Sequence, residues 1–320
     1  MTTRARRGTF ALLAVVCGVF WAVFTGLTPW PSVALLYGLE PLPDDSPERA
    51  EEVCVLDDWD ISESSGLAVS LRYPGCIWTH NDSGDTARLF LVDNTGKTRA
   101  VITVLQEATD WEDMCCFEFE GRTWLLIGDT GDNSATRGAS RPHCSLLLLP
   151  EPEIKLQPAG KAPVQLSRPV HYHYQFRYSE GRPDCESLAV DVENRQTLLL
   201  TKGAPGSAGL YRLPLPFERS RSVGQASLLC EVPIPWATGM DISTSGKRLA
   251  IVNPISGVLF ERQPDQTWCD VVRQQGSVIT LPLRRQGETV CFETEQTLLV
   301  GSEGRWQKLW RIHLAEKTQN

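Results

Sequence analysis

The stretch CIWTHNDSGD, residues 76–85, is a short apolar run that ends in an acidic, glycine-containing turn. The stretch WLLIGDTGDN, residues 124–133, has the same form. Short apolar runs bounded by Gly, Asn and Asp are typical of strands and turns rather than of helices. A chain that repeats such a unit is expected to bring equivalent acidic turns to one face of the molecule.

Internal repeats around these turns indicate the fold class. Five segments share a small or acidic residue followed by a short apolar strand, and they begin 47, 74, 52 and 50 residues apart. Each is followed by a second and a third apolar run, and four of them by a fourth. Four strands that recur at this spacing are the pattern of a β-propeller blade. The segments begin at Ser65, Glu112, Glu186, Thr238 and Glu288.

The repeats predict an all-β fold, a β-propeller of five four-stranded blades. The last repeat ends after its third strand, so residues 53–56, ahead of the first repeat, are predicted to add the missing edge strand and close the ring. The interval of 74 residues contains a polar, proline-rich insertion at residues 133–168. A sixth blade within that insertion is the alternative, because ~270 residues at ~45 per blade also give six.

The N-terminal segment has a different character. Arg4, Arg6 and Arg7 precede the apolar segment Thr9–Leu27, which contains no charged residue. About 20 apolar residues span a bilayer, and flanking arginines favour the cytoplasmic side. We therefore predict a single-pass signal anchor, a transmembrane helix over residues 1–28, with the C-terminal domain extracytoplasmic; secretion after signal cleavage is the alternative. A Pro-rich linker over 29–50, the propeller over 51–315 and a tail over 316–320 complete the predicted organisation.

Composition narrows the class of partner and the use of cysteine. The chain is 42% hydrophobic and 22% charged, with a net charge of -8, and no basic patch stands out, so nucleic acid is not an expected partner. Ten cysteines include Cys17 in the apolar segment, so at least one of the other nine is unpaired or pairs with another chain. Several lie in apolar runs and are interpreted as free, buried thiols: Cys115, Cys116, Cys230 and Cys291.

Propeller geometry predicts which side chains share the mouth of the central channel. The second strand of a blade runs antiparallel to the first, so its end lies on the same face as the start of the first. Three glutamates begin inner strands, and they would repel one another unless they bind a cation, pair with Lys202 or hold protons. We therefore predict a site for a hard cation such as calcium. Its predicted ligands are Glu112, Glu186, Glu288, Asp82 and Asp129.

Further candidates follow the ends of the second strands. Asn81, Lys202, Asn253 and Glu303 are predicted to bind a ligand there. His80 is the histidine nearest this site and is the candidate general base or ligand. For the turn residues Asp85, Asp132 and Asn133, the alternative is that their side chains only satisfy local backbone groups.

The inner motifs resemble those of a family of uncharacterised bacterial β-propeller proteins, over about residues 60–312. The resemblance implies a propeller broadly similar to TolB-like, phytase-like and strictosidine-synthase-like propellers, some of which bind calcium or hydrolyse esters. Where that family tends to have an arginine and a tyrosine after its fourth inner repeat, this chain has VNP at 252–254, which implies a changed activity. The matching motifs are WTHNDSG (78–84), DWED (110–113), GDTGDN (128–133), ESLAVD (186–191), TK (201–202), DIS (241–243), GETVCF (287–292) and SEG (302–304).

The sequence therefore predicts a membrane-anchored, extracytoplasmic β-propeller that binds a small-molecule or protein ligand, with a cation, at the acidic channel mouth. A metal-dependent hydrolase of phosphate or ester substrates is one alternative, in which a cation on Glu112, Glu186 and Asp82 polarises the substrate or activates water. A protein-interaction scaffold, in which the acidic ring is only structural, is the other. A fold of this kind hosts many activities, so the choice depends on the site.

Overall fold

The computed structural model describes residues 49–82, 84–132, 141–181, 183–203, 208–215 and 223–315, which belong to one compact unit, Pro47–Asn320. The predicted signal anchor, the linker up to residue 48 and the tail at 316–320 lie outside the described residues. In the part that is described, no helix has the length and apolar character needed to span a bilayer.

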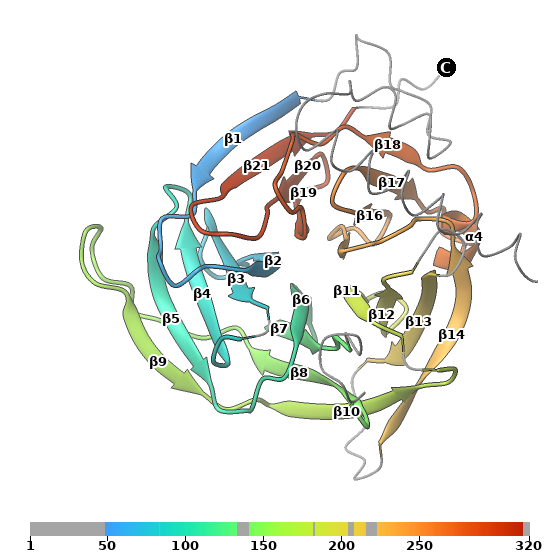
Figure 1. Cartoon of the computed structure of the whole chain (residues 1–320), viewed down its shortest axis with the longest axis horizontal. Coiled ribbons are helices and arrows are strands. Elements are labelled where there is room, and N and C mark those ends of the chain that lie inside the picture. Colours follow the sequence, from blue (N-terminus) through green and yellow to red (C-terminus); the bar gives the residue numbers. More distant parts are fainter. Residues whose placement is uncertain are drawn as a thin grey trace, which may run out of the picture. The chain divides into compact units, whose positions relative to one another are not determined.

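The described chain folds into five antiparallel four-stranded arms, the blades of a β-propeller (Figure 1). Blade 1 contains β2 (Ser64–Val69), β3 (Cys76–Asn81), β4 (Arg88–Asp93) and β5 (Thr98–Val104). Blade 2 contains β6 (Trp111–Phe119), β7 (Arg122–Asp129), β8 (Cys144–Pro150) and β10 (Tyr172–Tyr178). Blade 3 contains β11 (Cys185–Asp191), β12 (Gln196–Thr201), β13 (Ala208–Pro214) and β14 (Gly224–Val232).

The ring is completed by two further blades, the second of which joins the two ends of the described chain. Blade 4 contains β15 (Gly239–Ile242), β16 (Arg248–Val252), β17 (Gly257–Glu261) and β18 (Ser277–Ile279). Blade 5 contains β19 (Val290–Thr294), β20 (Thr297–Val300), β21 (Lys308–His313) and β1 (Arg49–Val55), and β1 pairs antiparallel with β21. The predicted closure of the ring by the segment ahead of the first repeat is therefore confirmed.

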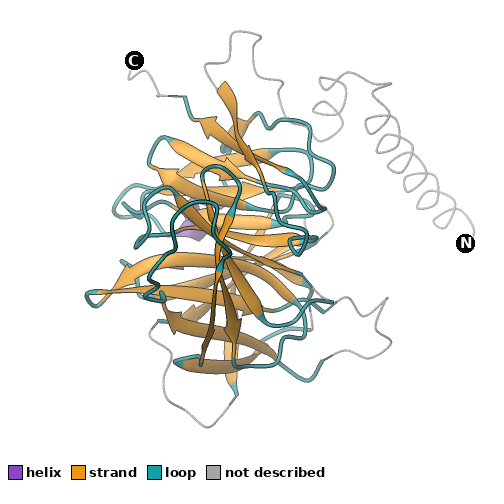
Figure 2. Cartoon of the chain, turned by 90° about the vertical axis from the view of Figure 1, so that its left-hand side faces the viewer, coloured by secondary structure: helices purple, strands orange, loops and turns teal. Residues whose placement is uncertain are grey.

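The first strand of each blade lies innermost, and these inner strands form a closed ring. Each contacts the next: β2 with β6, β6 with β11, β11 with β15, β15 with β19, and β19 with β2. In the side view, the strands run between two faces that carry the loops (Figure 2). The channel mouth is the face at which the inner strands begin.

Apolar packing between blades explains why the strands are apolar on both sides. Trp78 of blade 1 shares a buried cluster with Leu125 and Leu147 of blade 2. Leu126 of blade 2 packs in the same way with Leu199 of blade 3. Because each sheet is covered on both faces, its central strands are continuous apolar runs rather than alternating ones.

The insertion adds one strand to an existing blade. Its segment β9 (Val164–Arg168) pairs in parallel with β5 and makes blade 1 five-stranded. A second parallel pairing, β10 with β14, joins blades 2 and 3 into one eight-stranded sheet. Among the described residues there are five inner strands, and the insertion forms no sixth blade.

One cysteine differs from its predicted state. Cys230 on β14 is bonded to Cys269 in the short helix α4 (Trp268–Val272), with the two Cα atoms 5.9 Å apart. The interpretation of Cys230 as a free thiol is therefore wrong, because strand and helix come together only when blades 3 and 4 pack against each other. The same interpretation is confirmed for Cys115 and Cys291, which are free and buried, and Cys116 is free and partly buried.

Candidate cation site at the channel mouth

The structure brings the predicted glutamates to the channel mouth. Glu112 is the second residue of β6 and Glu186 the second residue of β11, while Glu288 lies just ahead of β19. All three side chains are buried. Asp82 and Glu303 follow the ends of β3 and β20, so both kinds of strand end contribute to this face as the repeats predict.

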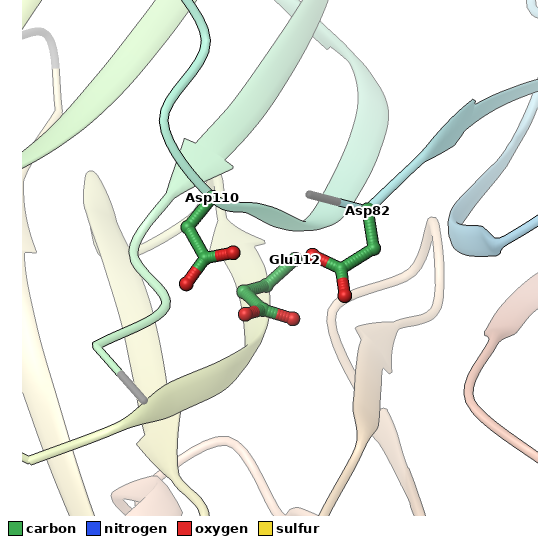
Figure 3. Close-up of side chains that lie close together, drawn as sticks. All are labelled: Asp82, Asp110 and Glu112. Atoms are coloured by element: carbon green, nitrogen blue, oxygen red, sulfur yellow. The ribbon is translucent and has the colours of Figure 1, made fainter. Parts of the chain in front are cut away.

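Two groups of carboxylates at this mouth have the spacing of metal ligands. In one, carboxylate oxygens of Asp82, Asp110 and Glu112 lie within 4.8 Å of one another, and the three side chains face a common point (Figure 3). In the other, carboxylate oxygens of Glu112, Asp184 and Glu186 lie within the same 4.8 Å of one another. Glu112 belongs to both groups and therefore lies at the centre of the acidic site.

Local backbone contacts explain why two carboxylates lie so close together. Asp129 accepts hydrogen bonds from the backbone N–H groups of Thr109 and Asp110, at 3.1 and 3.0 Å, and pairs with Arg141 at 2.7 Å. A Cβ atom at Gly131 would collide with the carboxylates of Glu112 and Asp110. The GDTGDN turn thus supplies both the anchor for the Asp110 loop and the space for two acidic side chains.

The carboxylate of Glu112 has no hydrogen bond or ion pair with any described residue, although the side chain is only 4% exposed. Burial raises its pKa well above the usual value, and the charges of Asp82, Glu186, Asp110 and Asp184 raise it further. A buried carboxylate of this kind either holds a proton or binds a cation.

Glu186, by contrast, has a partner. The ammonium group of Lys202 donates to both of its oxygens, at 2.7 and 2.6 Å. Burial nevertheless raises the pKa of Glu186 to about 8, against the opposing effect of Lys202. The pKa of Lys202 is also raised, because the attraction of Glu186, Glu288 and Glu112 outweighs the effect of burial.

Glu288 and Glu303 are the other glutamates at the channel mouth. Burial raises the pKa of Glu288, while the charges of Lys202 and Arg284 oppose that shift. Burial raises the pKa of Glu303 to about 8, with further contributions from Glu288 and Asp82. The channel mouth is therefore lined by carboxylates whose charged forms lack enough cationic partners.

Two predicted ligand-binding residues, Asn81 and Asn253, form their hydrogen bonds with nearby loops. The amide oxygen of Asn81 accepts from the backbone N–H groups of Ser62 and Glu63, and its amide nitrogen donates to Asp60 and Asp85. The amide oxygen of Asn253 accepts from two backbone N–H groups within its own turn, those of residues 255 and 256. These two side chains hold the loops at the mouth.

His80 lies beneath the mouth rather than in it. The side chain is 0% exposed, its ring lies edge-on to Trp111 at 5.4 Å, and its Nδ1 atom lies 2.9 Å from the carbonyl oxygen of Asn81. Burial lowers its pKa to about 4. The imidazole is therefore neutral at pH 7 and packed among interior groups.

Asp110 and Asp184 belong to the acidic groups but are not among the predicted ligands. Each precedes the glutamate of its inner strand by two residues, in the pattern Asp-x-Glu at 110–112 and 184–186. Recurrence of that pattern in two successive repeats was the available signal. In contrast, Asp129 and Glu288 lie outside both groups of three.

Comparison with known proteins adds little to this geometry. No family model and no curated protein matches the chain. Solved structures match weakly: one of a nidogen/laminin complex (9% identity, 76% of this chain and 73% of that chain, TM-score 0.43); the PQQ-bound aldose sugar dehydrogenase of Streptomyces coelicolor (10%, 84% and 98%, 0.43); and a putative 6-phosphogluconolactonase of Bacteroides uniformis (11%, 80% and 69%, 0.40). The propeller assignment therefore rests on the sheet topology, and the motif resemblance stays a prediction.

Proposed function

We propose that this protein is a membrane-anchored, extracytoplasmic β-propeller that binds a hard divalent cation at its channel mouth and engages a ligand there. The observation that carries the proposal is the buried carboxylate of Glu112, which has no described partner and faces Asp82 and Asp110. Carboxylate oxygens are the ligands that calcium prefers, and calcium tolerates irregular coordination.

Charge balance favours one of the two acidic groups. Lys202 already neutralises Glu186, so a cation on that side would meet the ammonium group. The group Asp82, Asp110 and Glu112 does not contain the lysine-paired Glu186, so in this proposal it holds the cation. A bound calcium ion would present its open coordination positions to a ligand oxygen.

Export is supported by two independent features. The apolar segment Thr9–Leu27 has the length and the flanking arginines of a signal anchor. A disulfide such as Cys230–Cys269 is typical of oxidising compartments, because cytosolic reductants keep most thiols reduced. Both favour an extracytoplasmic propeller.

The two alternatives have less support. A hydrolase at this site needs a general base that reaches the substrate, and the histidine considered for that role is fully buried with its pKa lowered to about 4. A scaffold with a purely structural ring requires the buried Glu112 carboxyl to hold its proton instead of a cation.

Calorimetric titration of calcium into the full-length chain in detergent tests the proposal. We expect binding to one site, and we expect Glu112→Gln to weaken it at least about tenfold, because the shared carboxylate loses its charge. Glu118→Gln is the matched control, since Glu118 is an exposed residue on the same strand β6. It should bind calcium like the wild type.

The outcomes separate the candidate functions. No heat of binding, together with a melting temperature that chelator leaves unchanged, would remove the cation from the proposal. Equal loss in Glu112→Gln and Glu118→Gln would place the ion elsewhere.

A further inference from the structure

Two exposed tryptophans lie on loops at the same face as the acidic mouth. Trp59 is 64% exposed and Trp306 is 47% exposed, and their rings meet edge to face with centroids 6.4 Å apart. Large aromatic side chains gathered at a surface mark binding sites more often than single exposed residues do. We call these two side chains the tryptophan pair.

Backbone contacts connect the tryptophan pair to the acidic mouth. Trp59 lies in the loop before β2 and Trp306 in the loop before β21, and Gly304 N–H donates to the carbonyl of Ser62 at 3.0 Å. The first loop is fixed to the mouth by the bond from Asp82 N–H to Glu63 O at 2.9 Å. The second loop itself carries Glu303.

The tryptophan pair lies close to an acid of the mouth along the chain. Glu303 and Trp306 are three residues apart, so their Cα atoms are at most ~10 Å apart. The acidic mouth and the indoles are therefore within reach of one extended ligand.

The conformation of Trp306 is costly. Its φ angle is +60°, in the left-handed region that bulky residues rarely adopt. The indole remains half exposed, so its own burial does not explain that conformation. Backbone strain that presents an exposed aromatic side chain is typical of binding loops.

From these observations we propose that the channel mouth binds an oligosaccharide, with vicinal hydroxyl groups on the cation and the apolar C–H face of a sugar ring against the tryptophan pair. This inference rests on the proposed function for the cation. Calcium takes hydroxyl oxygens as ligands, and an indole offers a flat apolar surface with a polar edge. A ligand that uses both features needs oxygen donors and an apolar face in one molecule.

Arg305 argues against a cationic ligand. Its guanidinium lies over the Trp59 ring, 4.5 Å from the centroid, and its Nε donates to the Trp59 carbonyl at 3.0 Å. One face of the indole is thus already next to a positive charge, which would repel an ammonium ligand. Neutral or acidic sugars meet no such repulsion.

An immobilised panel of oligosaccharides of three to six sugar units, probed with the full-length chain in calcium and in chelator, tests the inference. We expect calcium-dependent binding to a subset of the panel. Trp59→Ala and Trp306→Ala should each weaken it at least about tenfold while calcium binding by calorimetry stays unchanged. Trp59→Phe should retain part of the affinity, because a flat apolar face remains.

Leu283→Ala is the matched control, since Leu283 is 79% exposed and belongs to neither feature. It should bind sugars like the wild type. Calcium binding without any sugar binding would overturn the inference and leave the proposed function standing. Sugar binding that Trp59→Ala and Trp306→Ala do not change would also overturn the inference. Binding of a protein instead of a sugar to the tryptophan pair would overturn it as well. Absence of calcium binding would overturn the proposed function on which the inference rests.

Discussion

At the scale of single residues, Lys202 sets the charge at the channel mouth, with its ammonium 2.6 and 2.7 Å from the two oxygens of Glu186. The same ammonium interacts with Glu288 and Glu112. The carboxylate of Glu112 nevertheless has no hydrogen-bond partner among the described residues. One lysine is thus shared among three buried glutamates, which leaves room for a second cation.

Removal of that ammonium should strengthen cation binding. For Lys202→Met we expect calcium affinity to rise about fourfold, the effect of one unit charge on a divalent ion ~10 Å away in a water-like dielectric. Calcium calorimetry on the full-length variant measures the change. Lys97→Met is the control, because Lys97 forms an exposed pair with Asp57 away from the acidic ring. A fall in affinity would mean that Lys202 orients a calcium ligand.

At the scale of elements, a disulfide connects blade 4 to blade 3. The disulfide joins Cys230 on β14 to Cys269 on α4, across 39 residues of sequence. Helix α4 is only five residues long, and its start is capped by reciprocal hydrogen bonds between Thr267 and Asp270. So short a helix has little stability of its own, and the disulfide fixes it to the strand.

Loss of the disulfide should destabilise the propeller. For the double variant Cys230→Ser and Cys269→Ser we expect about 4 kcal/mol less unfolding free energy, from the chain entropy of a loop of this length. Urea denaturation of the full-length chain measures it. A reductant should shift the wild type by a similar amount and leave the double variant unchanged. An equal response of both proteins to reductant would contradict the pairing.

At the scale of the whole molecule, buried carboxylates connect neighbouring blades. Asp113 on β6 accepts from Leu188 N–H on β11 at 2.9 Å. Asp241 on β15 accepts from Phe292 N–H on β19 at 2.7 Å, and burial raises its pKa to about 7. Together with the acids of the mouth, they make the ring of inner strands sensitive to pH.

The cation-free protein should lose stability as pH rises. Burial raises the pKa of Glu303 to about 8, above that of the unfolded chain, so the folded state holds this proton. Its contribution to stability is fully present below about pH 4.5 and is lost as pH rises through 8. In chelator, we expect the melting temperature to fall by several degrees between pH 5.5 and 8.5.

Calcium should reduce that fall, because a bound ion stabilises the charged carboxylates. Calorimetric melting curves of the full-length chain, with and without calcium, measure both effects. A melting temperature that rises with pH in chelator would contradict the proposed protonation of the mouth.

The sequence by itself determined the propeller, the closing strand and the acidic mouth. Burial of both sheet faces makes each strand a short apolar run, and the repeat of that run is visible without any tertiary contact. The start of each inner strand follows from the same repeat, so Glu112, Glu186 and Glu288 were predictable as a set.

Only the tertiary structure decided which polar side chains at the mouth form hydrogen bonds or ion pairs within the protein and which are left to bind a cation. Asn81 and Asn253 form hydrogen bonds with nearby loops. Lys202 forms an ion pair with Glu186, while Glu112 faces Asp82 and Asp110. The pairing of β9 with blade 1 and the disulfide between Cys230 and Cys269 were likewise decided by the tertiary structure. Such pairings depend on ångström-scale distances between separate segments, and those distances arise only when the blades pack around the channel.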